Sequence, residues 1–172
     1  MRDWGPFAHH KTQTMARVLI LAYGNPMRCD DGLAWRAADE LEGQFAATEV
    51  EILRSHQLTP ELAEAVRGCE AVIFVDAAPA DGAHGEPGEV RIAPIVVPGE
   101  AARFSHHLSP SAVMGLAQRL YATNPRALSV TLTSECFDHG EALSPVVAAA
   151  IPDLVARIKA LVQELLSSET LR

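Results

Sequence analysis

Residues 17–32 of the 172-residue chain read RVLILAYGNPMRCDDG, and this stretch decides the fold. Its first seven residues form a short apolar run rich in strand-forming residues. A Gly-Asn-Pro sequence ends the run, as in a buried strand that enters a loop. Apolar residues at helical spacing then predict a helix over residues 32–41, with Asp31 placed to cap its N-terminus. The stretch therefore predicts a strand, a polar loop and a helix in succession.

The rest of the chain repeats this alternation of short apolar runs and helical patterns. Further strands are predicted over residues 48–53, 71–75, 89–95 and 127–132, and further helices over residues 59–66, 109–121 and 144–166. Pro94 favours an edge position for the strand in which it lies. Pro152 lies inside the last helical pattern and is expected to kink or divide that helix, because proline lacks a backbone donor.

Strands that alternate with helices predict right-handed crossovers and helices on both faces of a sheet. We therefore expect a three-layer α/β/α sandwich around a mostly parallel five-stranded sheet, which an edge strand can make mixed. One domain over residues 16–172 is expected, after a flexible tail at residues 1–15. If the strand order begins 2-1-3, the crevice at the carboxyl ends of the first and third strands is the place where ligands bind.

Composition excludes some functional classes. Hydrophobic residues make up 48% of the chain, but no apolar run reaches the roughly 18 residues of a membrane helix, so no membrane partner is expected. A formal net charge of −8 without a basic cluster argues against nucleic-acid binding. The three cysteines lie far apart in the sequence without a CxxC pair, which fits neither a disulfide framework nor structural zinc and favours a reducing cytoplasm.

Three side chains are candidates for one site at the predicted crevice. Asp31 follows the first strand, Asp76 closes the third, and His106 precedes the helix predicted from residue 109. Two carboxylates and an imidazole form a ligand set that suits a borderline divalent metal such as nickel, zinc or manganese. The simpler interpretations are a helix cap for Asp31, a paired strand-end carboxylate for Asp76 and a surface histidine for His106.

Other polar residues at this edge are candidates for supporting or substrate-contact roles. Of the neighbouring acids Asp30 and Asp31, we expect one to bond the loop backbone and the other to face the cleft. His107 is the neighbour of His106, so one of the two would point inward. His56 ends the second strand region, and His139 lies in the loop after the fifth strand.

Several familiar catalytic patterns are absent from the sequence. It contains no GxSxG, HExxH, GxxxxGK[ST] or GxGxxG motif, which argues against serine hydrolases, zincins, nucleoside triphosphatases and dinucleotide enzymes. Cys29 lies beside two acids, whose charge raises a thiol pKa, so it is a poor nucleophile and is interpreted as a packing residue.

From residue 17 to about residue 166, the chain resembles the hydrogenase maturation proteases. Residues 24–32, GNPMRCDDG, resemble that family's GN-x-hydrophobic-x-x-D-[DE]-G loop, and residues 72–77 resemble its apolar strand that ends in aspartate. Residues 105–108, SHHL, resemble its histidine segment before a helix. Ala22 departs from the glycine usual before the GN pair, and Asp31 is one methylene shorter than the alternative glutamate.

This resemblance implies an activity and a site. The family removes the C-terminal extension of a [NiFe]-hydrogenase large-subunit precursor once nickel has been inserted, and its metal-binding trio maps onto Asp31, Asp76 and His106. It also implies Asn25 as a supporting loop residue. Nickel would be carried by the precursor and used for recognition, although another divalent metal can occupy the site in isolation. We expect a cytoplasmic monomer that meets its precursor transiently.

Two alternatives to proteolysis stay open at this point. One is a nickel-binding hydrogenase assembly accessory protein that has the same fold and trio but cuts nothing. The other is a small-molecule binding domain, for which Arg28 is the obvious cation near the crevice.

Overall fold

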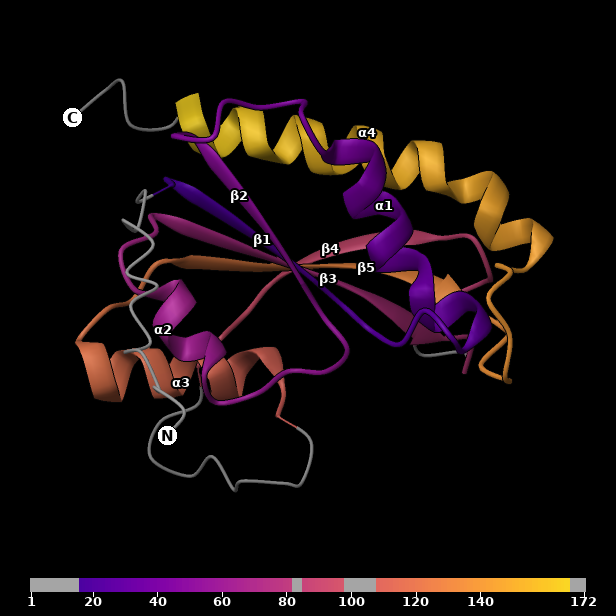
Figure 1. Ribbon diagram of the computed structural model, residues 1–172, viewed down its shortest axis with the longest axis horizontal. Coiled ribbons are helices and arrows are strands. Elements are labelled where there is room, and N and C mark those ends of the chain that lie inside the picture. Colours follow the sequence, from indigo (N-terminus) through magenta and orange to yellow (C-terminus); the bar gives the residue numbers. More distant parts are fainter. Residues whose placement is uncertain (1–15, 82–84, 98–107, 168–172) are drawn as a thin grey trace, which may run out of the picture.

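The computed structural model describes residues 16–81, 85–97 and 108–167, and its centre is one five-stranded sheet (Figure 1). The strand order is β2-β1-β3-β5-β4, and it thus has the 2-1-3 start on which the predicted crevice depends. Strands β2, β1, β3 and β5 are parallel, and β4 is antiparallel to β5 at the edge. The strands are β1 (Val18–Tyr23), β2 (Val50–Ser55), β3 (Ala71–Pro79), β4 (Val90–Pro94) and β5 (Arg126–Ser134).

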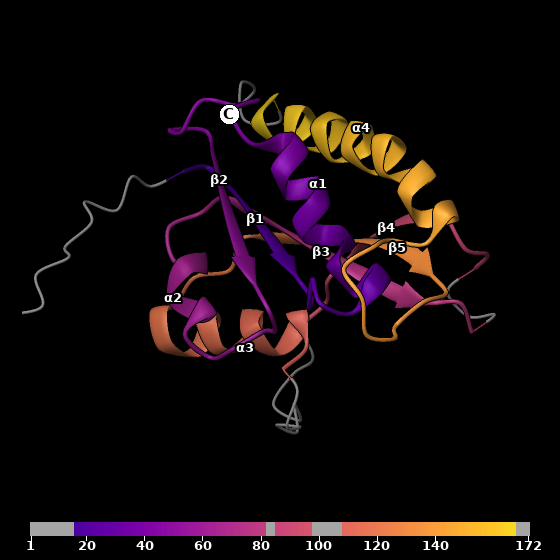
Figure 2. The ribbon, with the colours of Figure 1, turned by 45° about the vertical axis from the view of Figure 1, so that its right-hand side comes forward.

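Helices cover both faces of this sheet. Helices α1 (Leu33–Leu41) and α4 (Pro145–Ser167) lie on one face, and α2 (Leu62–Val66) and α3 (Pro110–Tyr121) lie on the other (Figures 1 and 2). A short 3-10 helix, η1 (Cys29–Gly32), joins the loop after β1 to α1. The three-layer α/β/α prediction and the mixed five-stranded sheet are therefore confirmed. No helix in residues 16–81, 85–97 and 108–167 is both long and apolar enough to cross a membrane.

The alternation of side chains along β1 explains why its sequence is continuously apolar. Val18 and Ile20 are buried in the core cluster under α1 and α4, whereas Leu19 and Leu21 are buried in the cluster under α2 and α3. A strand with helices on both faces must be apolar at every position. This double burial makes β1 the centre of the fold and fixes where its carboxyl end opens into the loop.

The structure corrects the predicted end of the third strand. Asp76 does not close β3, because β3 continues to Pro79 through pairing with β5. Pairing of β3 with β1 stops at Val75. Asp76 is therefore the first β3 residue that has lost its β1 neighbour, and it still lies at the edge where the sheet opens. The predicted tail at residues 1–15 lies outside the described residues.

One helix prediction was wrong, and one of the two alternatives for Pro152 is excluded. Asp31 does not cap α1, because Gly32 is the N-cap residue and no side chain accepts a bond there. Nor does Pro152 divide the last helix, since α4 runs unbroken from Pro145 to Ser167. Neighbouring apolar side chains of α4, including Ile151 and Leu154, are buried against the sheet. Tertiary packing thus outweighs the cost of the internal proline.

We expect Pro152→Ala to raise the free energy of unfolding by about 1–2 kcal/mol. An interior proline is about 3 kcal/mol worse than alanine in a helix, and the stiffer unfolded chain of the proline form offsets part of this. Urea denaturation followed by circular dichroism would measure the change. Pro145→Ala is the matched control, because proline at the first helical position is favourable, so this variant should gain no stability. Equal gains in both variants would contradict the explanation.

Candidate active site

Asp31 lies in η1, where the loop after β1 folds back on itself. Its Oδ2 accepts a hydrogen bond of 2.8 Å from the backbone N–H of Asn25, and the Asn25 side-chain oxygen accepts one of 2.9 Å from the N–H of Met27. Asn25, a predicted supporting residue, therefore fixes the loop through both its backbone and its side chain. Asp31 stays partly exposed while this bond holds it in place.

Two glycines allow the loop to close this tightly. Gly24 has a φ of +135°, and a Cβ there would collide with the backbone carbonyl oxygen of Asp31. At the other end, a Cβ on Gly32 would lie 2.8 Å from Cα of Pro26. Glycine fits both positions because it has no Cβ, and at Gly24 also because it tolerates a positive φ. The spacing of the GN…DDG pattern is thus a steric requirement of the loop.

Asp30 bonds a second loop, the one that follows β5. Its side chain is fully buried and accepts four hydrogen bonds from the loop after β5. Oδ1 accepts from the N–H of Ser144 at 2.7 Å, and Oδ2 accepts from the Ser144 hydroxyl at 2.9 Å and from the N–H groups of Glu135 and Cys136 at 3.3 and 3.0 Å. Both acids of the pair therefore bond loop backbone, Asp31 through one N–H group and Asp30 through three, and the cleft-facing role of Asp31 stays a prediction. Asp30 ties residues 135–144 to η1.

Asp76 is a largely buried carboxyl with two hydrogen bonds to its anion. Its Oδ1 accepts from the N–H of Ala77 at 2.8 Å, and the Tyr23 hydroxyl donates to the same carboxyl group. Burial nevertheless raises the pKa of Asp76 to about 6; the two hydrogen bonds oppose this rise, and the charge of Asp31 adds to it. Burial, and then the charge of Asp76, raise the pKa of Tyr23.

Asp31 and Asp76 therefore form a pair of like charges at the carboxyl end of β1 and β3. No Lys or Arg in the described parts of the chain forms an ion pair with either acid. Two neighbouring carboxylates, of which Asp76 is largely buried, favour a proton or an incoming cation. The pair can therefore supply two oxygen ligands to a cation that arrives with a substrate.

The third predicted ligand cannot be placed beside them, because His106 and His107 lie outside the described residues. Within residues 16–81, 85–97 and 108–167, no three His, Cys, Asp or Glu side chains come together in a group that could hold a metal. The described chain thus contributes two acids to the predicted trio.

The two other predicted histidines lie apart from the acid pair. His56 packs edge-to-face against Trp35, with ring centroids 5.0 Å apart. His139 is exposed in the loop that Asp30 holds. Within the described residues, neither histidine forms a hydrogen bond or an ion pair with Asp31 or Asp76. The structure therefore places His56 and His139 around the site and not in it.

The sequence analysis interpreted Cys29 as a packing residue whose thiol pKa is raised by the neighbouring acids. In the structure, the main cause of the raised pKa is a different one. The pKa of its thiol is raised to about 11, first by a hydrogen bond with Cys136 and less by the neighbouring acids. Cys29 has a left-handed backbone with φ of 45°, and its N–H donates to Gly140 at 2.6 Å. The two thiols therefore meet where η1 and residues 135–144 join.

Tyr23 and Ser144 are site residues that the sequence alone did not single out. The available signal for Tyr23 was a phenol at the last position of a buried strand, where the hydroxyl can reach the crevice. For Ser144, the sequence indicated only the start of a helix and gave no sign of its hydrogen bonds to Asp30.

Neither a family model nor a curated protein matches the chain, but solved structures do. The hydrogenase maturating endopeptidase HybD from E. coli has a TM-score of 0.67 at 25% identity, covering 86% of this chain and 93% of that one. The [NiFe] hydrogenase maturation protease HybD from Thermococcus kodakarensis has a TM-score of 0.65 at 26% identity, covering 85% and 99%. An endopeptidase from Escherichia coli solved in solution has a TM-score of 0.65 at 27% identity, covering 86% and 93%. The fold that carries the acid pair is thus shared with endopeptidases.

We expect Asp30→Asn to lower the free energy of unfolding by about 2–4 kcal/mol. The substitution removes a buried charge acceptor and turns an amide N–H₂ toward backbone donors, which then lose their partners. Urea denaturation at pH 7 would measure the loss. Asp31→Asn is the matched control, because its single bond to Asn25 can be kept by the amide oxygen, so it should cost less than about 1 kcal/mol. Equal losses would show that Asp30 does not hold the two loops.

We expect Asp76→Asn to stabilise the protein at pH 8 and to have little effect near pH 4. With a folded pKa of about 6, above the unfolded value near 3.9, the folded protein keeps a proton that the unfolded chain releases. The unfolding free energy of the unaltered protein therefore falls as pH rises from about 4 to about 6, and stays lower above that. The neutral amide avoids this loss, which is up to about 3 kcal/mol at 1.4 kcal/mol per pKa unit.

Denaturation curves between pH 4 and pH 8 would test this expectation. Asp153→Asn is the control, because Asp153 is exposed on α4 and forms an i,i+4 ion pair with Arg157 that is worth little. Parallel pH profiles for the unaltered protein and Asp76→Asn would contradict the raised pKa of the buried Asp76 carboxyl.

Proposed function

We propose that this chain, which belongs to the hydrogenase maturation protease family, is an endopeptidase that removes the C-terminal extension of a nickel-loaded [NiFe]-hydrogenase large-subunit precursor. The observation that carries the proposal is the Asp31 and Asp76 pair, held at the open edge of the sheet without a basic partner among the described residues. The shared fold with named endopeptidases at 25–27% identity supports the reaction type.

Nickel enters this account as part of the substrate. On this proposal, the precursor's cysteines hold the metal, and Asp31, Asp76 and His106 add oxygen and nitrogen ligands to it. A cation that arrives between the two acids removes their mutual repulsion and offsets the cost of their burial. A precursor without nickel would bring no such compensation. The charge pair therefore discriminates between loaded and empty precursors.

Positioning is the main contribution of the protein's own residues. The Tyr23 hydroxyl and the Ala77 N–H each bond the Asp76 carboxyl, and the Asn25 N–H holds Asp31. These bonds fix the carboxyl groups of Asp31 and Asp76 before the substrate arrives, so binding costs little further ordering of the two side chains. Once the metal is held there, the scissile bond of the tethered extension is placed at the crevice, where the metal can polarise its carbonyl or a water.

Location and assembly follow the sequence expectations. We place the reaction in the cytoplasm, and we propose that the chain acts as a monomer that binds its precursor transiently.

We expect Asp31→Asn to abolish processing while the protein stays folded. The amide keeps the bond to Asn25 but loses the charge that attracts the substrate's metal. Intact mass spectrometry of the nickel-loaded precursor from the same source, before and after incubation, would detect loss of a short C-terminal peptide. The unaltered protein and Asp153→Asn should both cut the loaded precursor, and neither should cut the nickel-free one.

Two results would overturn parts of the proposal. Normal processing by the Asp31→Asn variant would show that Asp31 is not needed for the reaction. Nickel-dependent binding of the precursor without any mass loss would instead assign the chain as a non-proteolytic accessory protein.

A further inference from the structure

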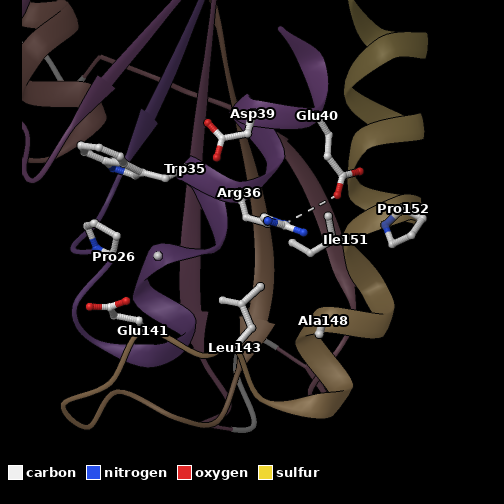
Figure 3. A pocket seen from close by; sticks show the side chains of 11 residues that line it. Pro26, Trp35, Arg36, Asp39, Glu40, Glu141, Leu143, Ala148, Ile151 and Pro152 are labelled. Atoms are coloured by element: carbon white, nitrogen blue, oxygen red, sulfur yellow. Dashed lines mark ion pairs between the residues drawn. The ribbon is translucent and has the colours of Figure 1, made fainter.

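A cavity of about 480 Å³ lies beside the loop that carries Asp31 but does not include either acid of the pair (Figure 3). It is lined by residues of α1, the first turns of α4 and the loop before α4, and we call it the α1–α4 groove. Pro26, which precedes η1, and Gly32, the last residue of η1, also line it. A bound substrate polypeptide that runs from the acid pair along this loop would therefore reach the α1–α4 groove.

The apolar part of the groove is held in place before any ligand binds. Trp35, Leu143 and Ile151 line it, and the indole N–H of Trp35 donates to the carbonyl of Ser55 at 3.3 Å. The ring of His56 packs on the same indole, which gives this exposed histidine a structural role. A preformed apolar wall of this kind suits an apolar side chain of a ligand.

The rim of the groove has an excess of negative charge. Asp39, Glu40 and Glu141 line it together with a single cation, Arg36. Figure 3 shows Arg36 pointing to Glu40, and the two form an ion pair of 3.9 Å. Asp39 is paired with Arg54 at 2.8 Å, whereas Glu141 has no ion-pair partner in the described part of the chain. The rim therefore favours a ligand that carries Lys or Arg.

Pro152 adds a hydrogen-bond acceptor to the same wall. Proline has no N–H, so the carbonyl of Ala148, four residues earlier in α4, lacks its helical i+4 donor. Both Ala148 and Pro152 line the groove. Ala148 is an exposed residue, and a helical carbonyl without its i+4 donor can accept from another N–H donor, such as a peptide amide or a basic side chain. The groove thus combines features that fit a polypeptide.

We propose that the α1–α4 groove binds the C-terminal extension of the precursor, through an apolar side chain on Trp35 and a Lys or Arg beside Glu141. This inference rests on the proposed function, and it names the surface that recognises the substrate. The volume lies within the roughly 300–1,000 Å³ of sites for small ligands, so it holds a few side chains of an extended segment and not a folded domain. The metal positions the scissile bond, and the groove holds the segment that is released.

A matched pair of variants on one helix tests the groove. Ala148→Trp fills it, whereas Ala149→Trp places the same side chain at the next, exposed position, which does not line the groove. With the nickel-loaded precursor as substrate, Ala148→Trp should raise KM about tenfold with kcat nearly unchanged, because the binding lost is equal in the ground and transition states. Glu141→Lys, in the loop, should raise KM in the same way. Ala149→Trp should behave like the unaltered protein.

Binding of the free extension provides a readout that does not depend on cleavage. A synthetic peptide with the sequence of the extension, titrated into the ¹⁵N-labelled protein, should shift amide signals of α1 and of residues 141–152, and these shifts should be lost in Ala148→Trp. Shifts elsewhere, no shifts, or an unchanged KM for Ala148→Trp would contradict the proposal that the groove binds the extension. If the peptide binds the groove but the unaltered protein cuts no precursor, the endopeptidase assignment is wrong, whereas the groove is still the binding site of the extension.

Discussion

The burial of the Asp76 carboxyl beside a second acid, Asp31, is the constraint on which the rest of the site depends. Burial raises the pKa of Asp76 to about 6, and the charge of the partly exposed Asp31 adds a smaller part of this rise. Such a pair costs stability in the empty protein, so it persists only because the surrounding structure holds it. Proteins retain costs of this kind at sites that need them, which is why the pair carries the functional conclusion.

The scaffold meets this constraint with two layers of support. The double-sided burial of β1 fixes the point at which its chain leaves the sheet, and Gly24 lets the following loop fold back against Asp31. Asp30 then joins that loop to residues 135–144, which lead into α4. Glu141 and Leu143 of this connection line the α1–α4 groove. In the proposed function, the loop that holds Asp31 would take part in recognising the metal, and residues joined to it by Asp30 would take part in recognising the extension.

The fold was predictable from local pattern, and the site only in part. Continuous apolar runs identified β1 and β3, and the family resemblance pointed to Asp31 and Asp76. The role of Asp30 was not readable, because its donors lie more than a hundred residues away in the sequence. The extension of β3 beyond Asp76 depends on pairing with β5, and Tyr23 is recognised only once its hydroxyl meets Asp76. Local periodicity contains none of these long-range contacts.

Nickel K-edge X-ray absorption of the loaded precursor, frozen before turnover with and without this protein, tests the central claim most directly. If the acid pair completes the coordination of the metal, the protein should add oxygen or nitrogen scatterers to the sulfur ligands of the precursor. The Asp31→Asn and Asp76→Asn forms should add fewer. An unchanged first coordination shell in a complex that is still processed would contradict metal recognition by the two carboxylates.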